Sequence, residues 1–352
     1  MSHDSFPHRE HGGPDARGAA AFDFSTNANA CGPCAVALAS VLRADASRYP
    51  DPQYTALREK LAERHAVAPE RIALAASASD AIFRLTARAA QRGLRKVVVP
   101  VHAFGDYAHA ARAWELPAVP RDDDTPRFAR GMALTWACDP ASPTGDDDPP
   151  GMPEDSVLAL DCAYAPLRLS GQSGWDTAAR DRAWQVWSPN KALGLTGVRA
   201  AYAIAPRGAE SEVRALDRLA PSWPVGAHGV AMLDIWCSTA VADWLAESLQ
   251  RLRTWKARQL GMLDVLGWDC APGHANFFCA RPPFAGGTRL QGLLQAMHVQ
   301  GVALRDATSF GLPRTVRMSV QPPAAQDALR RAWGAAIGIN YGNGPAPLRR
   351  MP

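Results

Sequence analysis

The stretch VWSPNKALGLTGVRAAYAIA, residues 186–205, places a single lysine, Lys191, among small and apolar residues. An ammonium group that leaves water is stable only when it is paired, neutralised or chemically modified. One interpretation is that Lys191 lies on a loop with its amine in solvent, as most lysines do. The other is that the amine attacks a carbonyl carbon, as lysines that form Schiff bases do. The rest of the chain has to supply the partners that distinguish the two.

The composition is that of a globular protein whose partners are small molecules or a second copy of itself. The chain has 352 residues, of which 47% are hydrophobic and 20% charged, and its formal net charge is +4. This length predicts two domains, or one large and one small. The basic residues are scattered, so a nucleic-acid groove has no electrostatic support.

Neither targeting segments nor metal sites are expected. Residues 1–18 lack the apolar segment of a secretory signal, and no apolar run approaches the ~18 residues of a membrane span. We therefore expect a cytoplasmic protein that makes no membrane contacts. The seven cysteines do not resemble a disulfide framework. Cys31 and Cys34 form a CxxC motif, but the polar stretch before them does not favour a redox dithiol. Neither a second CxxC nor a close pair of histidines follows, so the motif does not predict a metal site.

Apolar strands alternate with helical patterns along the chain. The patterns predict helices at 52–67, 77–93, 227–266, 288–301 and 324–338, and strands at 67–75, 96–100, 132–138, 156–161, 183–188, 198–205, 275–280, 302–305 and 316–320. The central strands are apolar throughout, which is typical of a sheet buried on both faces. We predict an α/β protein: a three-layer αβα large domain with a mostly parallel central sheet, and a smaller α+β domain.

Several residues that suit one cofactor follow the predicted strands. Asp161 ends one strand, and Tyr164 comes three residues later. Phe104, Lys191 and Arg199 also lie near strand ends, where open α/β sheets bind ligands. Pyridoxal phosphate needs a lysine amine, an acid for its ring nitrogen and donors for its phosphate. The start of the helix at 77–93, with Ser77 and Ser79, suits the phosphate. Taken singly, Asp161 could cap a helix, Phe104 could be core and Arg199 could form a surface ion pair.

The order of these residues resembles the class I/II aminotransferase family, of fold type I among pyridoxal-phosphate enzymes. LALDCAY followed by SPNKALGLTGVR carries the resemblance, which extends from about His11 to about Trp333. Within the family, the chain is similar to the branch of histidinol-phosphate aminotransferase and threonine-phosphate decarboxylase. The motifs for that branch are HGG, DFSTNANACGP, RYPDPQY, PTG, WPV, PGHANFF and LRDATSFGLPRTVRMSV.

The resemblance implies a role for each matching residue. Lys191 would hold pyridoxal 5'-phosphate as a Schiff base, Asp161 its pyridine nitrogen and Tyr164 its ring oxygen. The other implied cofactor residues are Phe104 against the ring, Ser142 near the ring oxygen, and Ser77, Ala78, Ser79, Ser188 and Arg199 around the phosphate. Tyr49 would reach the cofactor phosphate of a partner subunit, which implies a homodimer. On the substrate side, the resemblance implies Arg317 for a carboxylate, Arg305 for a phosphate, and Asn27.

The resemblance also implies a division of the chain. Residues 1–20 are expected to form a flexible arm, and 21–50 a segment that packs with the small domain and the partner subunit. The large cofactor domain is expected at 51–240, the small domain at 241–340 and a tail at 341–352.

The chain departs from the branch at several positions. Ala75, Ala76 and Ser77 stand where the branch has GNG, and Ser142 stands where it has an asparagine. Cys162 and Asp80 each replace a glutamate. The substrate therefore does not follow from the branch average.

Three functions remain open at this point. The first is transamination of an amino acid or amino-alcohol phosphate, similar to histidinol-phosphate aminotransferase. The second is decarboxylation, similar to the L-threonine-O-3-phosphate decarboxylase of cobalamin biosynthesis. The choice depends on which substrate bond lies perpendicular to the cofactor ring. The third is a protein that binds the cofactor without turnover.

Overall fold

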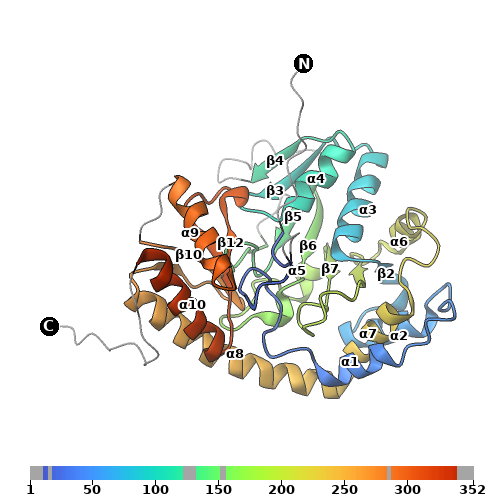
Figure 1. Ribbon diagram of the computed structural model, residues 1–352. Helices are drawn as coiled ribbons and strands as arrows, with labels where there is room; N and C mark the ends of the chain where they lie inside the picture. Colours follow the sequence, from blue (N-terminus) through green and yellow to red (C-terminus); the bar gives the residue numbers. More distant parts are fainter. Residues whose placement is uncertain (1–10, 15–17, 122–131, 151–155, 284–286, 339–352) are drawn as a thin grey trace. The chain divides into compact units, whose positions relative to one another are not determined.

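The computed structural model describes residues 11–14, 18–121, 132–150, 156–283 and 287–338 (Figure 1). The predicted tail at 341–352 and most of the predicted arm at 1–20 lie outside the described residues. The chain forms two compact units. The first contains residues 1–27, 254–273 and 277–352, and the second contains residues 28–253 and 274–276. The domain boundaries at residues 51 and 241 stay a prediction.

The second unit is built on a seven-stranded sheet in the order β2-β8-β7-β6-β5-β3-β4. Its strands are β2 (Ile72–Ala75), β3 (Lys96–Pro100), β4 (Ala118–Arg121), β5 (Ala133–Cys138), β6 (Val157–Asp161), β7 (Ala183–Trp187) and β8 (Ala201–Ile204). Only β8 runs antiparallel to its neighbours. The predicted α/β class with a mostly parallel central sheet is confirmed.

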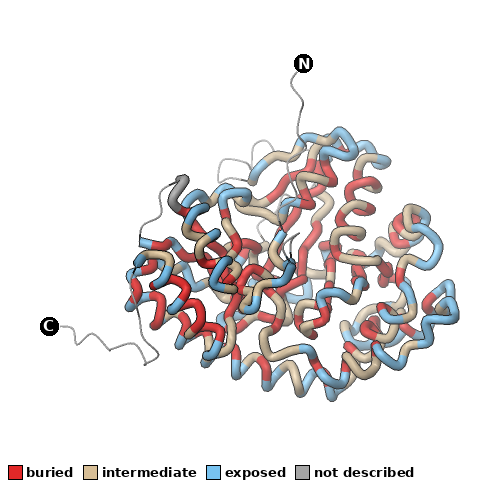
Figure 2. The backbone as a smooth tube through the Cα atoms, viewed as in Figure 1, coloured by how far each residue is buried: buried red, intermediate tan, exposed pale blue. Residues whose placement is uncertain are grey.

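Helices cover both faces of this sheet, which explains why its strands are apolar throughout. The helices of the second unit include α1 (Ala35–Leu42), α2 (Thr55–His65), α3 (Ala78–Gln91), α4 (Gly105–Ala113), α5 (Thr177–Asp181), α6 (Glu210–Asp217) and α7 (Ala227–Trp236), with short 3₁₀ turns at Pro69–Arg71 and Ala165–Leu167. Trp136 of β5 packs with the α3 and α4 side chains on one face, whereas the next residue, Ala137, packs with Trp175 and α5 on the other. This alternation gives the three predicted layers, and Figure 2 shows the sheet strands largely buried.

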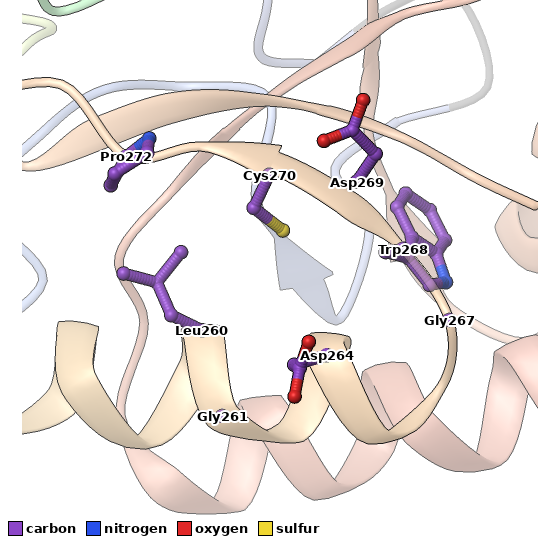
Figure 3. A pocket seen from close by; sticks show the side chains of 8 residues that line it. All are labelled: Leu260, Gly261, Asp264, Gly267, Trp268, Asp269, Cys270 and Pro272. Carbon is purple, nitrogen blue, oxygen red and sulfur yellow. The ribbon is translucent and has the colours of Figure 1, made fainter.

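The first unit carries a smaller antiparallel sheet in the order β12-β13-β10-β9. Its elements are β1 (Phe22–Asp23), β9 (Asp269–Ala271), β10 (Phe277–Arg281), β11 (Val302–Ala303), β12 (Arg305–Asp306), β13 (Val316–Ser319), α9 (Gly287–Val299), α10 (Pro323–Ile337) and a 3₁₀ turn at Thr308–Phe310. A pocket of about 680 Å³ lies between β9 and the end of α8 (Thr239–Val265) (Figure 3). Its lining includes none of the predicted site residues.

Two predicted elements are divided in the structure. The helix expected at 227–266 is interrupted at residues 237–238, where the Ser238 hydroxyl accepts the Val241 N–H at the start of α8. The strand expected at 302–305 is split, because Val302 and Ala303 pair with β1 while Arg305 pairs with β13. Among the described residues, no helix combines the length and the apolar character that a bilayer crossing needs.

A histidine at the end of α2 is held neutral inside the second unit. The His65 ring stacks on Trp187 with centroids 4.7 Å apart, and its Nε2 lies 2.7 Å from the Tyr202 hydroxyl. That hydroxyl oxygen already accepts the indole N–H of Trp236 at 3.3 Å, so its own proton points to His65. Burial, together with the positive charges of Arg64 and Arg180, lowers the pKa of His65 to about 4.

The low pKa of His65 predicts a loss of stability in acid. The unfolded chain binds a proton near pH 6.5 and the folded chain only near pH 4, so protonation favours unfolding as the pH falls between these values. We expect the free energy of unfolding to fall by up to about 3 kcal/mol across this window. Urea unfolding followed by tryptophan fluorescence measures it. His65→Gln should flatten this pH dependence, whereas the control His228→Gln, at an exposed position, should keep it. Equal slopes for both variants would contradict the assignment.

Candidate functional site

The register of the sheet in the second unit brings several strand ends to one edge. Asp161 at the end of β6 lies opposite Cys138 of β5 and Val186 of β7. Ala75 at the end of β2 lies opposite Ala201 at the start of β8, because these two strands are antiparallel. Residues that follow β2, β5, β6 and β7, or precede β8, therefore emerge at the same edge, as ligand sites of open α/β sheets do.

Asp161 is a buried carboxylate with two donors. Its side chain is buried, and the Tyr107 hydroxyl donates to its Oδ2 at 2.7 Å while the Ala163 N–H donates to its Oδ1 at 2.9 Å. Burial raises the pKa of Asp161, and the two hydrogen bonds and the positive charge of Lys191 oppose that shift. A carboxylate in this setting gains from a cation placed before it.

Lys191 lies beside the other two residues predicted as catalytic. Its Nζ is 5.3 Å from the centre of the Tyr164 ring, and its charge acts on Asp161. Lys191 is half-buried, whereas Tyr164 is buried. The structure thus brings together Lys191, Tyr164 and Asp161. Of the two interpretations of the lysine, a partly enclosed amine beside a buried acid favours the chemical one.

Phe104 and Tyr107 form an aromatic group against Asp161. Phe104 precedes the first residue of α4, and its ring meets the Tyr107 ring edge to face at 5.9 Å. Tyr107 stacks on Trp136 with centroids 4.6 Å apart, which fixes the hydroxyl that Asp161 accepts. Tyr107 was not predicted from the sequence. Its signal is the three-residue spacing from Phe104, which places both rings on one helix face.

The start of α3 offers backbone donors. The Ser77 hydroxyl caps the helix by accepting the Asp80 N–H at 3.0 Å. The amides of Ala78 and Ser79 belong to the first turn, which has no partners within its own helix. Asp80 brings a negative charge to this turn, but it forms an ion pair with Arg84 at 3.1 Å and accepts the Ala76 N–H. The negative charge that Asp80 brings to this turn is therefore balanced by Arg84.

The loop around Lys191 holds two further candidates. Ser188 is buried and donates its hydroxyl proton to Asn190 Oδ1 at 2.9 Å. The Asn190 amide reaches the carbonyls of Thr196 and Val198 at 3.3 and 3.5 Å, which fixes the loop from within. Arg199 is exposed, and in the described part of the chain no ion pair is recorded for it. Asn190 was not predicted as a site residue from the sequence, although it directly precedes Lys191.

Two departures from the branch differ in their position. Ser142 is buried after β5, and its N–H donates to the thiol of Cys138, which is the residue opposite Asp161. It therefore lies at the site edge. Cys162 instead packs with Trp175 in the core on the α5 face, where burial raises its pKa.

Tyr49 lies on the surface of the second unit. Its side chain is 77% exposed, and its ring stacks on Trp223 with centroids 4.2 Å apart. The Trp223 indole N–H donates to the Pro50 carbonyl at 3.1 Å, which fixes the pair.

The substrate-side candidates belong to the first unit. Arg305 and Arg317 are buried and directly opposite each other on β12 and β13. The Phe310 ring lies 5.0 Å from the Arg305 guanidinium and 5.4 Å from that of Arg317. The Arg317 guanidinium also donates to the Ser25 carbonyl at 3.0 Å, and Asn27 is buried nearby in the sequence. Two adjacent guanidinium groups favour an anion with more than one acceptor oxygen.

The residues of the second unit fit the cofactor that the sequence resemblance implies. A half-buried amine lies over an aromatic ring, a buried carboxylate stands at the strand edge, and Phe104 supplies a flat apolar face. Exposed Arg199 and the first turn of α3 emerge at the same edge and supply donors to an anion. This donor set matches pyridoxal phosphate group by group.

Comparisons with known proteins identify the family of this chain. Residues 154–334, just over half of the chain, match the family model described as aminotransferase class I and II. A histidinol-phosphate aminotransferase from Jannaschia sp. (strain CCS1) is 28% identical over 319 residues, which cover 85% of this chain and 86% of that protein.

Two solved structures share the fold. One is L-threonine-O-3-phosphate decarboxylase from Porphyromonas gingivalis, with 22% identity and a TM-score of 0.74 over 90% of this chain and 99% of that one. The other is histidinol-phosphate aminotransferase from Sinorhizobium meliloti in complex with pyridoxal-5'-phosphate, with 20% identity and a TM-score of 0.74 over 90% and 91%. The resemblance found in the sequence is confirmed: this chain belongs to the class I and II aminotransferase family.

Proposed function

We propose that this chain is a pyridoxal-phosphate-dependent aminotransferase that acts on a small amino substrate carrying a phosphate group, as histidinol-phosphate aminotransferases do. The observation that carries the proposal is the position of Lys191, whose amine lies over the Tyr164 ring and acts on the buried carboxylate of Asp161. The 28% identity to a histidinol-phosphate aminotransferase supports the substrate class.

Each residue of the edge has a proposed task. When bound, the cofactor supplies a carbonyl carbon and a ring that accepts electrons. Asp161 would hold the protonated ring nitrogen, and Tyr164 would donate to the ring oxygen. Lys191 would hold the carbonyl carbon, and its free amine would take the proton from the substrate α-carbon. Phe104 covers one face of the ring and excludes water.

The phosphate of the cofactor has its own proposed donors. These are the amides of Ala78 and Ser79, the hydroxyls of Ser77 and Ser188, and the guanidinium of Arg199. The register of β2 and β8 supports this group, because the residues after Ala75 and before Ala201 emerge together. Ser142 takes the place of an asparagine near the ring oxygen, where its shorter side chain needs a water to span the gap.

Decarboxylation is the second candidate. The HGG and DFSTNAN motifs favour it, and the decarboxylase from P. gingivalis shares the fold. In that reaction Lys191 would protonate the substrate carbon after the carboxylate leaves. A third candidate is a protein that binds the cofactor without turnover. The paired arginines of the first unit argue against it, because a site without turnover does not need residues that bind a substrate. The cytoplasmic location expected from the sequence stays a prediction.

Assays with two substrates separate these candidates. We expect histidinol phosphate to lose its amino group only when 2-oxoglutarate is present, and threonine phosphate to release little carbon dioxide. Release of carbon dioxide from threonine phosphate without any keto acid would favour the decarboxylase. Lys191→Ala should lower either activity by at least about 10³-fold. Borohydride reduction followed by peptide mapping should label Lys191, and a label elsewhere would contradict its role.

Arg305 is proposed to bind the substrate phosphate. Removing a charge-assisted hydrogen bond of this kind costs roughly 1.5–3 kcal/mol, so Arg305→Ala should lower kcat/KM for histidinol phosphate about 10- to 100-fold. The same variant should change kcat/KM for unphosphorylated histidinol little. Arg331→Ala, at an exposed position of α10, is the matched control. Equal losses for both substrates would show that Arg305 does not recognise the phosphate.

A homodimer is proposed in which Tyr49 reaches the cofactor phosphate of the partner subunit. Its 77% exposure and its stacking on Trp223 support an apolar contact surface at this place. Tyr49 has no proposed task within its own subunit.

Mixed subunits test the action of Tyr49 across the dimer. Tyr49→Ala and Lys191→Ala should each be defective alone. After unfolding and refolding together they should regain activity, because one site of each mixed dimer then has both an intact Lys191 and an intact Tyr49. Light scattering should give twice the chain mass of 37.7 kDa. A mixture as inactive as its components would place Tyr49 in its own subunit or outside the site.

A further inference from the structure

A short N-terminal segment is hydrogen-bonded to the backbone of the Lys191 loop. We name residues 29–34 the strap; they belong to the second unit, as does the loop. The Asn29 N–H donates to the Lys191 carbonyl at 2.9 Å, and the Asn29 side-chain amide donates to the Ala192 carbonyl at 3.0 Å. At the other end of the strap, the Cys34 N–H donates to the Leu193 carbonyl at 2.9 Å. Three successive carbonyls of the loop are therefore held.

The two backbones also approach each other closely. A Cβ atom on Gly194 would lie 3.0 Å from Gly32 Cα and 3.2 Å from Pro33 Cα, and a Cβ on Gly32 would lie 3.1 Å from the Leu193 carbonyl oxygen. Gly194 also has a φ of +66°, a conformation that side chains disfavour. Glycine on both sides is therefore a condition of this contact.

The side chain of Asn29 makes hydrogen bonds both within the strap and to the Lys191 loop. It is buried, with 3% exposure, and its Oδ1 accepts the Cys31 N–H at 3.0 Å while its amide binds the loop. Its backbone carbonyl accepts the Gly32 N–H at 3.0 Å. Asn29 thus shapes the strap and attaches it with one side chain. The CxxC cysteines are part of this structure, since the Cys31 N–H donates to Asn29 Oδ1 and the Cys34 N–H donates to the Leu193 carbonyl.

The loop is fixed from its inner side by other groups. Asn190 links Ser188 to the carbonyls of Thr196 and Val198. The Lys191 carbonyl accepts the Gly194 N–H as well as the Asn29 N–H. The residues on either side of Lys191 are therefore held, Asn190 from within the loop and Ala192 by the strap. The direction in which the lysine side chain leaves the backbone depends on both.

We propose that Asn29 is a positioning residue that sets the direction of the Lys191 amine toward Tyr164 and Asp161. This inference rests on the proposed function of Lys191. Without the Asn29 side chain, the Ala192 carbonyl loses its donor and the loop samples other orientations, which lowers the effective concentration of the amine at the carbonyl carbon it attacks. Asn29 touches neither reacting atoms nor cofactor in this role.

Two variants disturb the contact from opposite sides. Asn29→Ala removes the side-chain donor from the strap, and Gly194→Ala forces the loop away from Gly32. Ser40→Ala is the control for the loss of a long-range hydrogen bond. Like Asn29→Ala, it removes a side-chain donor near the N-terminus from a backbone carbonyl far along the chain, here that of Ala231. Leu57→Ala, in the core around α2, is the control for lost stability.

Four readouts report on the Lys191 loop and its amine rather than on folding alone. We expect Asn29→Ala and Gly194→Ala to weaken pyridoxal phosphate binding about tenfold and to shift the pH midpoint of its bound absorbance by about half a unit or more. Hydrogen exchange should increase in the peptide covering residues 190–198 of the cofactor-free protein. kcat should fall more than KM rises. Both controls should match the wild type in all four readouts, whatever their loss of thermal stability.

The outcomes separate the inference from the function on which it rests. If the wild type itself does not bind pyridoxal phosphate, the proposed function is wrong. If the wild type binds it, and Asn29→Ala changes thermal stability alone with an unaltered pH midpoint and unaltered exchange at 190–198, Asn29 is only a structural residue. A pH midpoint shifted equally by Leu57→Ala would also overturn the inference.

Discussion

The buried carboxylate of Asp161 is the constraint on which the second unit depends. A charge in this position is tolerated because Tyr107 and the Ala163 amide donate to it and Lys191 lies nearby. Each of these partners has to be supported in turn: Tyr107 by stacking on Trp136, and Lys191 by its loop. Helix α4, through Tyr107, and the loop that carries Lys191 are thus both tied to one acid at the end of β6.

The sheet register converts this constraint into a site. Because Asp161 lies opposite both Cys138 and Val186, the segments that carry Ser142 and Ser188 leave the sheet beside it. Arg199 precedes β8 instead of following it, but β8 runs antiparallel to its neighbours, so Arg199 still lies at the same edge. A fully parallel sheet would have placed that arginine at the opposite end.

The sequence predicted elements better than contacts between elements. Apolar runs and caps predicted the central strands and α3, with Ser77 at its start, because these depend on neighbouring residues. Lys191, Asp161 and Tyr164 were predicted from strand ends and from the family resemblance, and the structure brings them together. Tyr107 and Asn29 were missed, since their partners lie 54 and 163 positions away and no local pattern records such a pair. At the break after α7 the Ser238 hydroxyl caps α8, and hydrophobic periodicity does not detect such a cap.

The three residues His274–Asn276 affect the order in which the chain can complete its two units. They belong to the second unit although their neighbours on both sides belong to the first, so the polypeptide changes unit four times. The His274 N–H donates to the Gly145 carbonyl, and the His274 carbonyl accepts the Leu169 N–H. The side-chain amide of Asn276 donates to the Ala28 carbonyl. A polypeptide ending at Arg253 would therefore contain every lysine-loop and strand-end residue and still leave these backbone groups unmatched. During synthesis, the part of the protein that holds Lys191 can be completed only after most of the chain has left the ribosome.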